Sequence, residues 1–170
     1  MNTLRRAIVS FVILAGLALF TATPIYSQSL PRVVVLPIRN MDGNIGLNKY
    51  CYTIADSLRI VLAQHEQHNK QYTIVPADSV EMVLAEFNLD PNNPQYESDI
   101  WKAVAALNTT LVVSGTFNFN GGRMLVNIYC YNAKTKIADQ ANAAKNIFKA
   151  PEKILDMIPV MRDKIVPALK

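Results

Sequence analysis

Residues 110–131 read TLVVSGTFNFNGGRMLVNIYCY, and this stretch governs the second half of the chain. Its first ten residues are rich in β-branched and aromatic side chains, and its last nine alternate between apolar and polar types. Both patterns favour strands. Asn120, Gly121 and Gly122 lie between them and accept the positive φ that hairpin turns demand. We therefore predict antiparallel strands over residues 110–119 and 123–131, with a weaker third strand over 136–145.

Outward from this hairpin, the first half of the chain alternates strands with helices. Residues 32–38, RVVVLPI, form a continuous apolar run that is typical of a strand buried on both faces. A short strand is predicted over residues 72–75. Apolar side chains at helical spacing predict further elements. The first helix is predicted over residues 48–67, and the second begins after Asp78 as its N-cap. The third is predicted over residues 98–107 with Ser98 as a cap. The fourth runs from residue 151 to about 169, and Pro159 predicts a kink or a frayed start within it.

The predicted order is β-α-β-α-α-β-β-β-α. We expect a mixed α/β (α+β) fold, in which helices cover a sheet of about five strands. The sequence contains no repeat or low-complexity linker after its first residues. Residues 28–170 are therefore predicted to form a single domain, a length that supports one ordinary core.

Residues 1–27 have the layout of a secretory signal peptide. Arg5 and Arg6 precede an uncharged apolar run over residues 7–22, which is shorter than the roughly 20 residues that span a bilayer. We place the cleavage site after Ser27, and an uncleaved membrane anchor is the alternative. The two cysteines lie far downstream, so the lipid-attachment Cys of a lipoprotein signal is missing. We expect a periplasmic protein, with outer-membrane association left open.

The charge of the chain argues against nucleic-acid binding. The sequence has 17 basic and 13 acidic residues, for a net charge of +4. Removal of Arg5 and Arg6 with the signal leaves 15 against 13, or +2. The remaining basic residues are scattered, which excludes the basic stripe of a nucleic-acid-binding domain. We expect peripheral membrane contact or none after cleavage.

No motif of catalysis or cofactor binding is present, and we expect neither an enzyme nor a cofactor. His65 and His68 share a helix face, but a zinc site needs further ligands and the sequence has no other His. We therefore predict no metal. Cys51 and Cys130 could form a disulfide in an oxidising compartment. We favour two buried thiols, since free Cys is commonly buried.

The loop between the first strand and the first helix is our candidate for binding a small ligand. Ligands of α/β sheets favour the carboxyl ends of strands and the N-termini of helices. The loop lacks the glycine patterns of nucleotide-binding sites, so an ordinary polar loop is the alternative. Its candidate ligand-binding residues are Arg39, Asn40, Asp42 and Asn44.

Alternating aromatic residues on the hairpin are our candidate for a partner surface. Phe117 and Phe119 lie on one strand, and Tyr129 and Tyr131 lie on the other. Cross-strand aromatic residues usually stabilise a sheet, and we favour that role. If no helix covers their face, they form a binding patch, and an exposed sheet edge accepts an added strand.

Four segments resemble the family that includes the TolB amino-terminal domain, FlgO, LpoB and the periplasmic part of CsgG. They are the strand ending in Leu36-Pro37-Ile38, the helix segment Ile54-Ala55-Asp56-Ser57-Leu58, the strand over residues 72–75, and the Val113-Ser114-Gly115-Thr116 strand followed by Gly121-Gly122. The resemblance covers nearly all of residues 32–169. The chain has no propeller, no lipid-attachment Cys and no room for pore-forming hairpins, so we do not expect a secretion channel.

The resemblance implies a non-enzymatic envelope module that binds an envelope protein whose identity does not transfer. The alternative function is binding of a small ligand or anion in the periplasm by the loop over residues 39–46.

Overall fold

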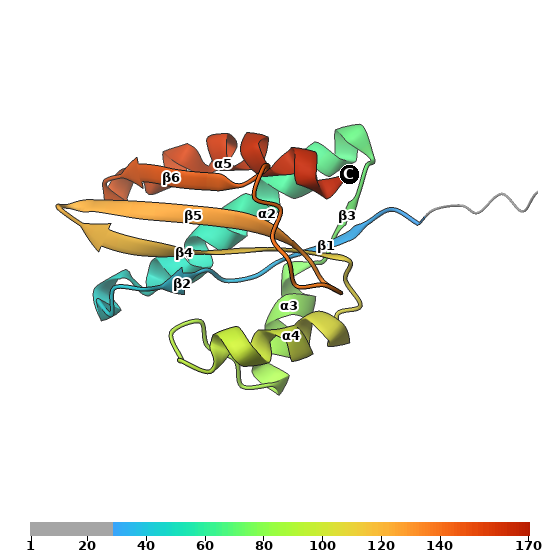
Figure 1. Ribbon diagram of the computed structural model, residues 1–170, viewed down its shortest axis with the longest axis horizontal. Coiled ribbons are helices and arrows are strands. Elements are labelled where there is room, and N and C mark those ends of the chain that lie inside the picture. Colours follow the sequence, from blue (N-terminus) through green and yellow to red (C-terminus); the bar gives the residue numbers. More distant parts are fainter. Residues whose placement is uncertain (1–28) are drawn as a thin grey trace, which may run out of the picture.

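The computed structural model describes residues 29–170, and the predicted signal peptide lies outside them. A single sheet runs through the molecule with helices on both sides (Figure 1). Its strands are β1 (Arg32–Val35), β2 (Arg39–Asn40), β3 (Thr73–Ile74), β4 (Leu111–Asn120), β5 (Arg123–Asn132) and β6 (Ala144–Lys149). The α-helices are α2 (Lys49–Asn69), α3 (Ala77–Glu86), α4 (Tyr96–Ala106) and α5 (Ile158–Ile165), and the 3-10 helices are η1 (Ile45–Leu47), η2 (Pro151–Met157) and η3 (Val166–Leu169).

The strand order is β3-β1-β4-β5-β6, which confirms the predicted mixed α/β sheet. β1 is parallel to β3 and β4, whereas β4, β5 and β6 are antiparallel. β2 follows β1 along the same edge of β4. Pro37 lies between β1 and β2 and has no N–H to donate, which explains the break.

The third antiparallel strand was predicted over residues 136–145, and this placement is wrong. β6 begins only at Ala144, and most of the predicted segment is a loop. Within this loop the Asn132 side chain accepts hydrogen bonds from the backbone of Lys134 and Thr135. The Asp139 carboxylate does the same for Ala141 and Asn142. These local hydrogen bonds compete with strand pairing, so the third strand begins later in the sequence than predicted.

Two helix starts also differ from the prediction. The N-cap of α3 is Pro76, and Asp78 lies in the first turn. α4 begins at Tyr96, so Ser98 lies within the helix, where its hydroxyl donates to the Gln95 carbonyl. The break predicted from Pro159 is confirmed, because a 3-10 helix precedes α5 and Pro159 falls in the first turn of α5, where a helix tolerates its missing N–H.

The two faces of the sheet are covered unequally. α2 and α5 lie along one face, and the main core between them and the sheet includes Val113, Val126 and Ile128. α3 and α4 cover the other face only beside β1, β3 and the start of β4, as Figure 1 shows below the sheet. Alternate residues of β5 are accordingly buried toward α2 and α5 and only half-buried on the opposite side.

We call the uncovered side of β4, β5 and β6 the open face. Its residues alternate along β4 and β5 with residues buried under α2 and α5. They are Ser114, Thr116, Asn118, Asn120, Arg123, Leu125, Asn127, Tyr129 and Tyr131, together with Lys145 and Phe148 of β6.

Candidate functional site

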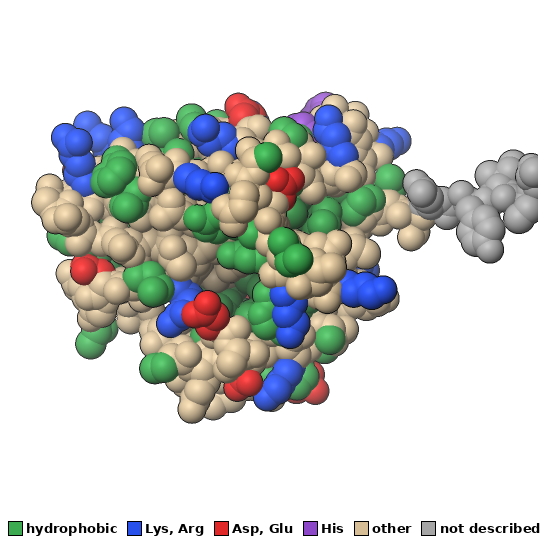
Figure 2. Space-filling model, viewed as in Figure 1, with side chains coloured by type: hydrophobic (Ala, Val, Ile, Leu, Met, Phe, Trp, Pro, Cys, Tyr) green, Lys and Arg blue, Asp and Glu red, His purple; other side chains and the backbone are tan. Residues whose placement is uncertain are grey.

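A cleft lies where α4 meets the open face. It has a volume of about 330 Å³, and Figure 2 shows a hollow lined by apolar side chains between the sheet and the helices below it. The sheet contributes Ser114 and Thr116 to its wall, and α4 contributes Glu97 and Trp101. The cleft is therefore continuous with the open face, and we treat the two as one site.

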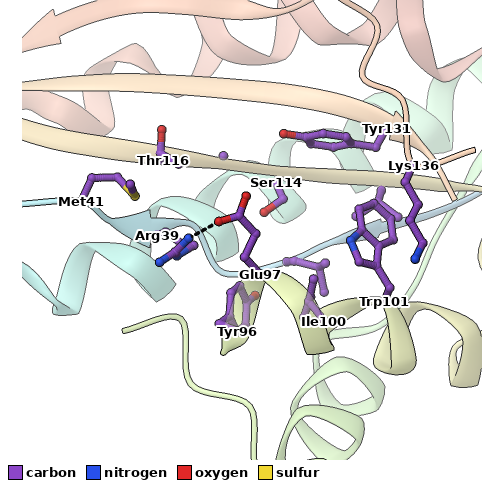
Figure 3. Close-up of a pocket in the computed structure, with 13 residues that line it drawn as sticks. Arg39, Met41, Tyr96, Glu97, Ile100, Trp101, Ser114, Thr116, Tyr131 and Lys136 are labelled. Carbon is purple, nitrogen blue, oxygen red and sulfur yellow. Dashed lines mark hydrogen bonds and ion pairs between the residues drawn. The ribbon is translucent and has the colours of Figure 1, made fainter. Parts of the chain in front are cut away.

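One end of the cleft is polar. Arg39 Nη1 lies 2.5 Å from Glu97 Oε2, so an ion pair joins β2 to α4 (Figure 3). The Glu97 side chain is 78% exposed, which limits the contribution of the pair to stability to about 1 kcal/mol or less. Arg39 Nε is buried and has no hydrogen-bond partner among residues 29–170.

The other end is aromatic. The rings of Trp101 and Tyr131 meet edge to face with centroids 6.0 Å apart, and Lys136 Nζ lies 5.5 Å from the Trp101 ring centroid. Tyr129 continues the row at 6.1 Å from Tyr131, and Lys145 Nζ lies 5.9 Å from its ring. Burial raises the pKa of Tyr131, and Tyr129 and Glu97 contribute to this rise. These cation–π contacts pair each lysine with a half-exposed ring.

The predicted ligand-binding loop is mostly occupied by its own hydrogen bonds. Asn40 Nδ2 donates to the Asn44 carbonyl at 2.9 Å and to Asn48 Oδ1 at 2.8 Å. Asn44 Oδ1 accepts from the Gly46 amide, and the Asp42 amide donates to Asn40 Oδ1. Of the four predicted residues, only Arg39 lines the cleft. The structure does not bring Asn40, Asp42 and Asn44 together with it as a ligand site.

The four predicted aromatic residues do not share a surface. Phe117 pairs with Val126 and is fully buried toward α2 and α5, and Phe119 packs against the same core. Tyr129 and Tyr131 lie on the open face. Phe117 and Phe119 are therefore core residues, as the favoured alternative predicted, and only the tyrosines remain candidates for partner contact.

Both thiols are buried and free. Cys51 Sγ donates to Asn92 Oδ1 at 3.5 Å, and Cys130 Sγ donates to the Ala168 carbonyl at 3.7 Å. Burial raises the pKa of Cys51, and it raises that of Cys130 to about 12. The two cysteines form no disulfide in this structure.

The histidines at the end of α2 have separate partners. His65 Nδ1 lies 3.1 Å from Tyr72 Oη, and His68 Nδ1 lies 2.8 Å from the Gln64 carbonyl oxygen. Within residues 29–170, no three His, Cys, Asp or Glu side chains gather in a group that could hold a metal ion.

Sequence reasoning missed three residues of the cleft. Glu97 and Lys136 carried no motif, and Trp101 lay inside the helix predicted over residues 98–107 without being proposed as a site residue. Trp101 is the single tryptophan of the chain and is half-buried. A lone Trp on a predicted helix was the one available signal, because large aromatic residues are enriched at binding surfaces.

None of the helices in the described part of the chain is both long enough and apolar enough to span a membrane.

Comparisons with known proteins identify a shared fold. Neither a protein-family model nor a curated protein matches the chain significantly. Among solved structures, the lipoprotein GNA1162 from Neisseria meningitidis aligns over 82% of this chain and 99% of its own, at 15% identity and a TM-score of 0.52. The C-terminal domain of LpoB from Escherichia coli aligns over 71% of this chain and 82% of its own, at 16% identity and a TM-score of 0.49.

TolB from Acinetobacter baumannii is also similar, over 84% of this chain and 29% of its own, at 15% identity and a TM-score of 0.41. LpoB and TolB, two of the proteins that the sequence resembles, are thus among the similar solved structures. The fold that these findings define is a mixed sheet covered by helices, which the chain shares with the meningococcal lipoprotein over nearly the whole length of that protein.

Proposed function

We propose that this chain is an exported, non-enzymatic protein of the bacterial cell envelope that binds a protein partner through its open face. The periplasm is its expected location, because residues 1–27 have the layout of a signal peptide. The fold shared with a lipoprotein is consistent with this placement.

The unequal covering of the sheet carries this proposal. One face packs under α2 and α5, whereas three strands of the other face keep Tyr129, Tyr131 and Phe148 in contact with solvent. Phe148 is 50% exposed. Aromatic side chains lose little entropy on binding and are enriched at protein interfaces, so such a row suits a partner surface.

The chemistry of the cleft supports a non-enzymatic role. Among the described residues that line it, Glu97 is the only carboxylate, and it is already paired with Arg39. Ser114 lines the cleft without a His or Cys beside it in the lining. Nucleophilic catalysis needs a base within hydrogen-bond reach of the nucleophile, and among the described residues neither Glu97 nor Lys136, the two groups of the lining that could act as a base, is hydrogen-bonded to the Ser114 hydroxyl.

Site-specific photo-crosslinking in bacterial cells tests the proposal. A photoreactive amino acid replaces Phe148 or Tyr129 in the full chain, and Val160 on α5 serves as a control because it is 38% exposed on the opposite layer. We expect mass spectrometry to identify the same protein adduct at Phe148 and Tyr129 and not at Val160. No specific adduct on the open face, or equal adducts at Val160, would contradict the proposal.

A second candidate function is binding of a small anion in the cleft. The buried Nε of Arg39, which has no hydrogen-bond partner in the described part of the chain, and the ring of Trp101 favour an aromatic carboxylate. Because Trp101 is the single tryptophan, its fluorescence reports on the cleft. A saturable change on titration with benzoate that Arg39→Gln abolishes would support this function, and an unchanged spectrum would refute it.

A further inference from the structure

The three strands that form the open face carry only positive charge. β4, β5 and β6 contain no Asp or Glu, and their charged residues are Arg123, Lys145 and Lys149. Arg123 has the same alternation as Leu125, and Lys145 lies over the ring of Tyr129, so both belong to the open face. Lys136, in the loop before β6, adds a third cation where the open face meets the cleft.

These three cations are not neutralised by the rest of the described chain. None of Arg123, Lys136 and Lys145 takes part in an ion pair within residues 29–170. The acidic groups closest in the chain or in the cleft have other partners. Glu97 is paired with Arg39, and the Asp139 carboxylate accepts hydrogen bonds from Ala141 and Asn142.

The cations alternate with apolar groups along β5. Arg123 lies next to the hairpin turn. Leu125 and its cross-strand partner Phe148 lie next along the row, and Tyr129 with Lys145 lies beyond them. The row ends at Tyr131, beside Trp101 and Lys136. Residues 123–131 of an antiparallel strand span about 27 Å, which is the length of an extended segment of about eight residues.

We propose that the open face binds an extended, acidic and partly apolar segment of the partner protein. This inference rests on the proposed function and names the chemistry of the partner. The carboxylates of the segment would meet Arg123, Lys145 and Lys136, and its apolar side chains would pack between them on Leu125, Phe148 and the tyrosines. Complementary charge along such a row steers the approach of a segment and fixes its register.

Other polyanions fit this pattern less well. A nucleic acid or an anionic lipid surface is recognised chiefly through the number of phosphate contacts, and three cations spread along a strand provide few. We therefore favour a peptide and make the other polyanions outcomes of the test.

Binding of designed peptides to the protein recovered from cells that express the full chain tests the inference. The probes are ten-residue peptides in which Val alternates with Glu, Gln or Lys, together with a peptide of Glu and Gly. The test variant R123Q/K136Q/K145Q is compared with K153Q/K164Q/K170Q, which removes the same charge from exposed residues outside the open face. Thermal unfolding of each variant verifies that it is folded.

We expect the Glu-Val peptide to bind more tightly than the other three. We expect R123Q/K136Q/K145Q to weaken this binding about tenfold, since three exposed ion pairs of modest strength are lost. The matched variant should change it less than twofold. Equal binding of the Glu-Val and Gln-Val peptides, or equal loss in the two variants, would overturn the inference.

Two further measurements separate this inference from the proposed function. Anionic phosphatidylglycerol vesicles or single-stranded DNA that bind as tightly as the Glu-Val peptide would identify a general polyanion site and overturn the inference. In cells, a protein that crosslinks to position 148 equally in the wild type and in R123Q/K136Q/K145Q would refute the acidic segment and leave the proposed function intact. Loss of the adduct in that variant alone would support both.

Discussion

Among the glycines of the described chain, Gly115 is the position where one added carbon has the largest expected effect, because the β5 backbone lies directly against it. Gly115 pairs with Ile128 in the middle of the hairpin. A Cβ at this position would lie 2.0 Å from the Asn127 carbonyl oxygen and 3.0 Å from Ile128 Cα. Restoring a separation of 3.0 Å from that oxygen requires one strand to move by about 1 Å, because close-packed backbone has no free space to absorb the methyl group.

The free-energy change of Gly115→Ala follows from this displacement. Overpacking of a filled interior costs about 1–3 kcal/mol. Movement of β5 also lengthens the hydrogen bonds on either side of the contact, and each contributes about 1 kcal/mol net. We therefore expect a loss of about 3–5 kcal/mol, which is a large part of the 5–15 kcal/mol that stabilises a typical domain.

Urea unfolding followed by circular dichroism measures this loss. With a slope of about 2 kcal/mol per molar urea, the midpoint should fall by about 1.5–2.5 M. Gly121→Ala is the control, since Gly121 has a φ of 56° and no atom within 4 Å of an added Cβ. Its expected loss is only the left-handed backbone strain of about 1–2 kcal/mol. If Gly115→Ala destabilises the protein less than Gly121→Ala does, the close approach of the strands is wrong.

Three further predictions concern buried polar groups. Arg59→Met should lower the free energy of unfolding by about 1–3 kcal/mol, because Arg59 Nη2 donates to the buried Val35 carbonyl at 2.8 Å; an unchanged urea midpoint would contradict this. Iodoacetamide at pH 8 should leave Cys51 and Cys130 unmodified in the native protein and modify both in urea, because burial keeps the thiols protonated; rapid native labelling would contradict it. Burial raises the pKa of Tyr72 from 10.0 to about 12, so its contribution to stability is complete below pH 10 and is lost as the pH rises from 10 toward 12. Tyr72→Phe should make the urea midpoint less sensitive to pH over that interval, and an identical dependence in both proteins would refute the assignment.

The strands and helices that the sequence predicted best are those with strong periodicity. The continuous apolar run over residues 32–38 predicted a strand buried on both faces, and β1 is buried between the two helical layers. A side-chain contact links this segment to the helix segment Ile54-Ala55-Asp56-Ser57-Leu58. Asp56 binds Arg59 Nη1, and Arg59 reaches the Val35 carbonyl. Two of the four segments that carried the family resemblance are therefore joined in space through Arg59.

Prediction failed where local side-chain bonds outweigh a weak pattern. Residues 136–145 alternate poorly, and the Asn132 and Asp139 side chains bind nearby backbone amides instead of leaving them to a strand. The sequence shows these residue types. Whether the segment forms a turn or pairs as a strand, however, depends on the backbone hydrogen-bonding groups that β5 presents in the folded protein. The true strand, β6, is shifted toward the C-terminus as a result.

The candidate site was predicted only in part, because it depends on which half of a sheet the helices leave uncovered. Arg39 was identified from its place between a strand and a helix, yet its partner Glu97 is 58 residues away in sequence. Trp101 and Lys136 likewise meet only because α4 ends beside the loop that follows β5. Helix position across a sheet is a tertiary property, and no local pattern in these segments specifies it.

The separation of the four aromatic residues, in contrast, was already determined by the hairpin turn. A two-residue Gly121-Gly122 turn sets Asn120 opposite Arg123, and counting back from that pair sets Phe117 opposite Val126 and Tyr129 opposite Ser114. Directly opposed residues share a face, so Phe117 must lie with the apolar side of β5 and Tyr129 with its polar side. The alternation of each strand was used in the prediction, but the register between the strands was not. The register that the turn length sets therefore divides the four aromatic residues into a core pair, Phe117 and Phe119, and a surface pair, Tyr129 and Tyr131. Only the surface pair is available to a partner.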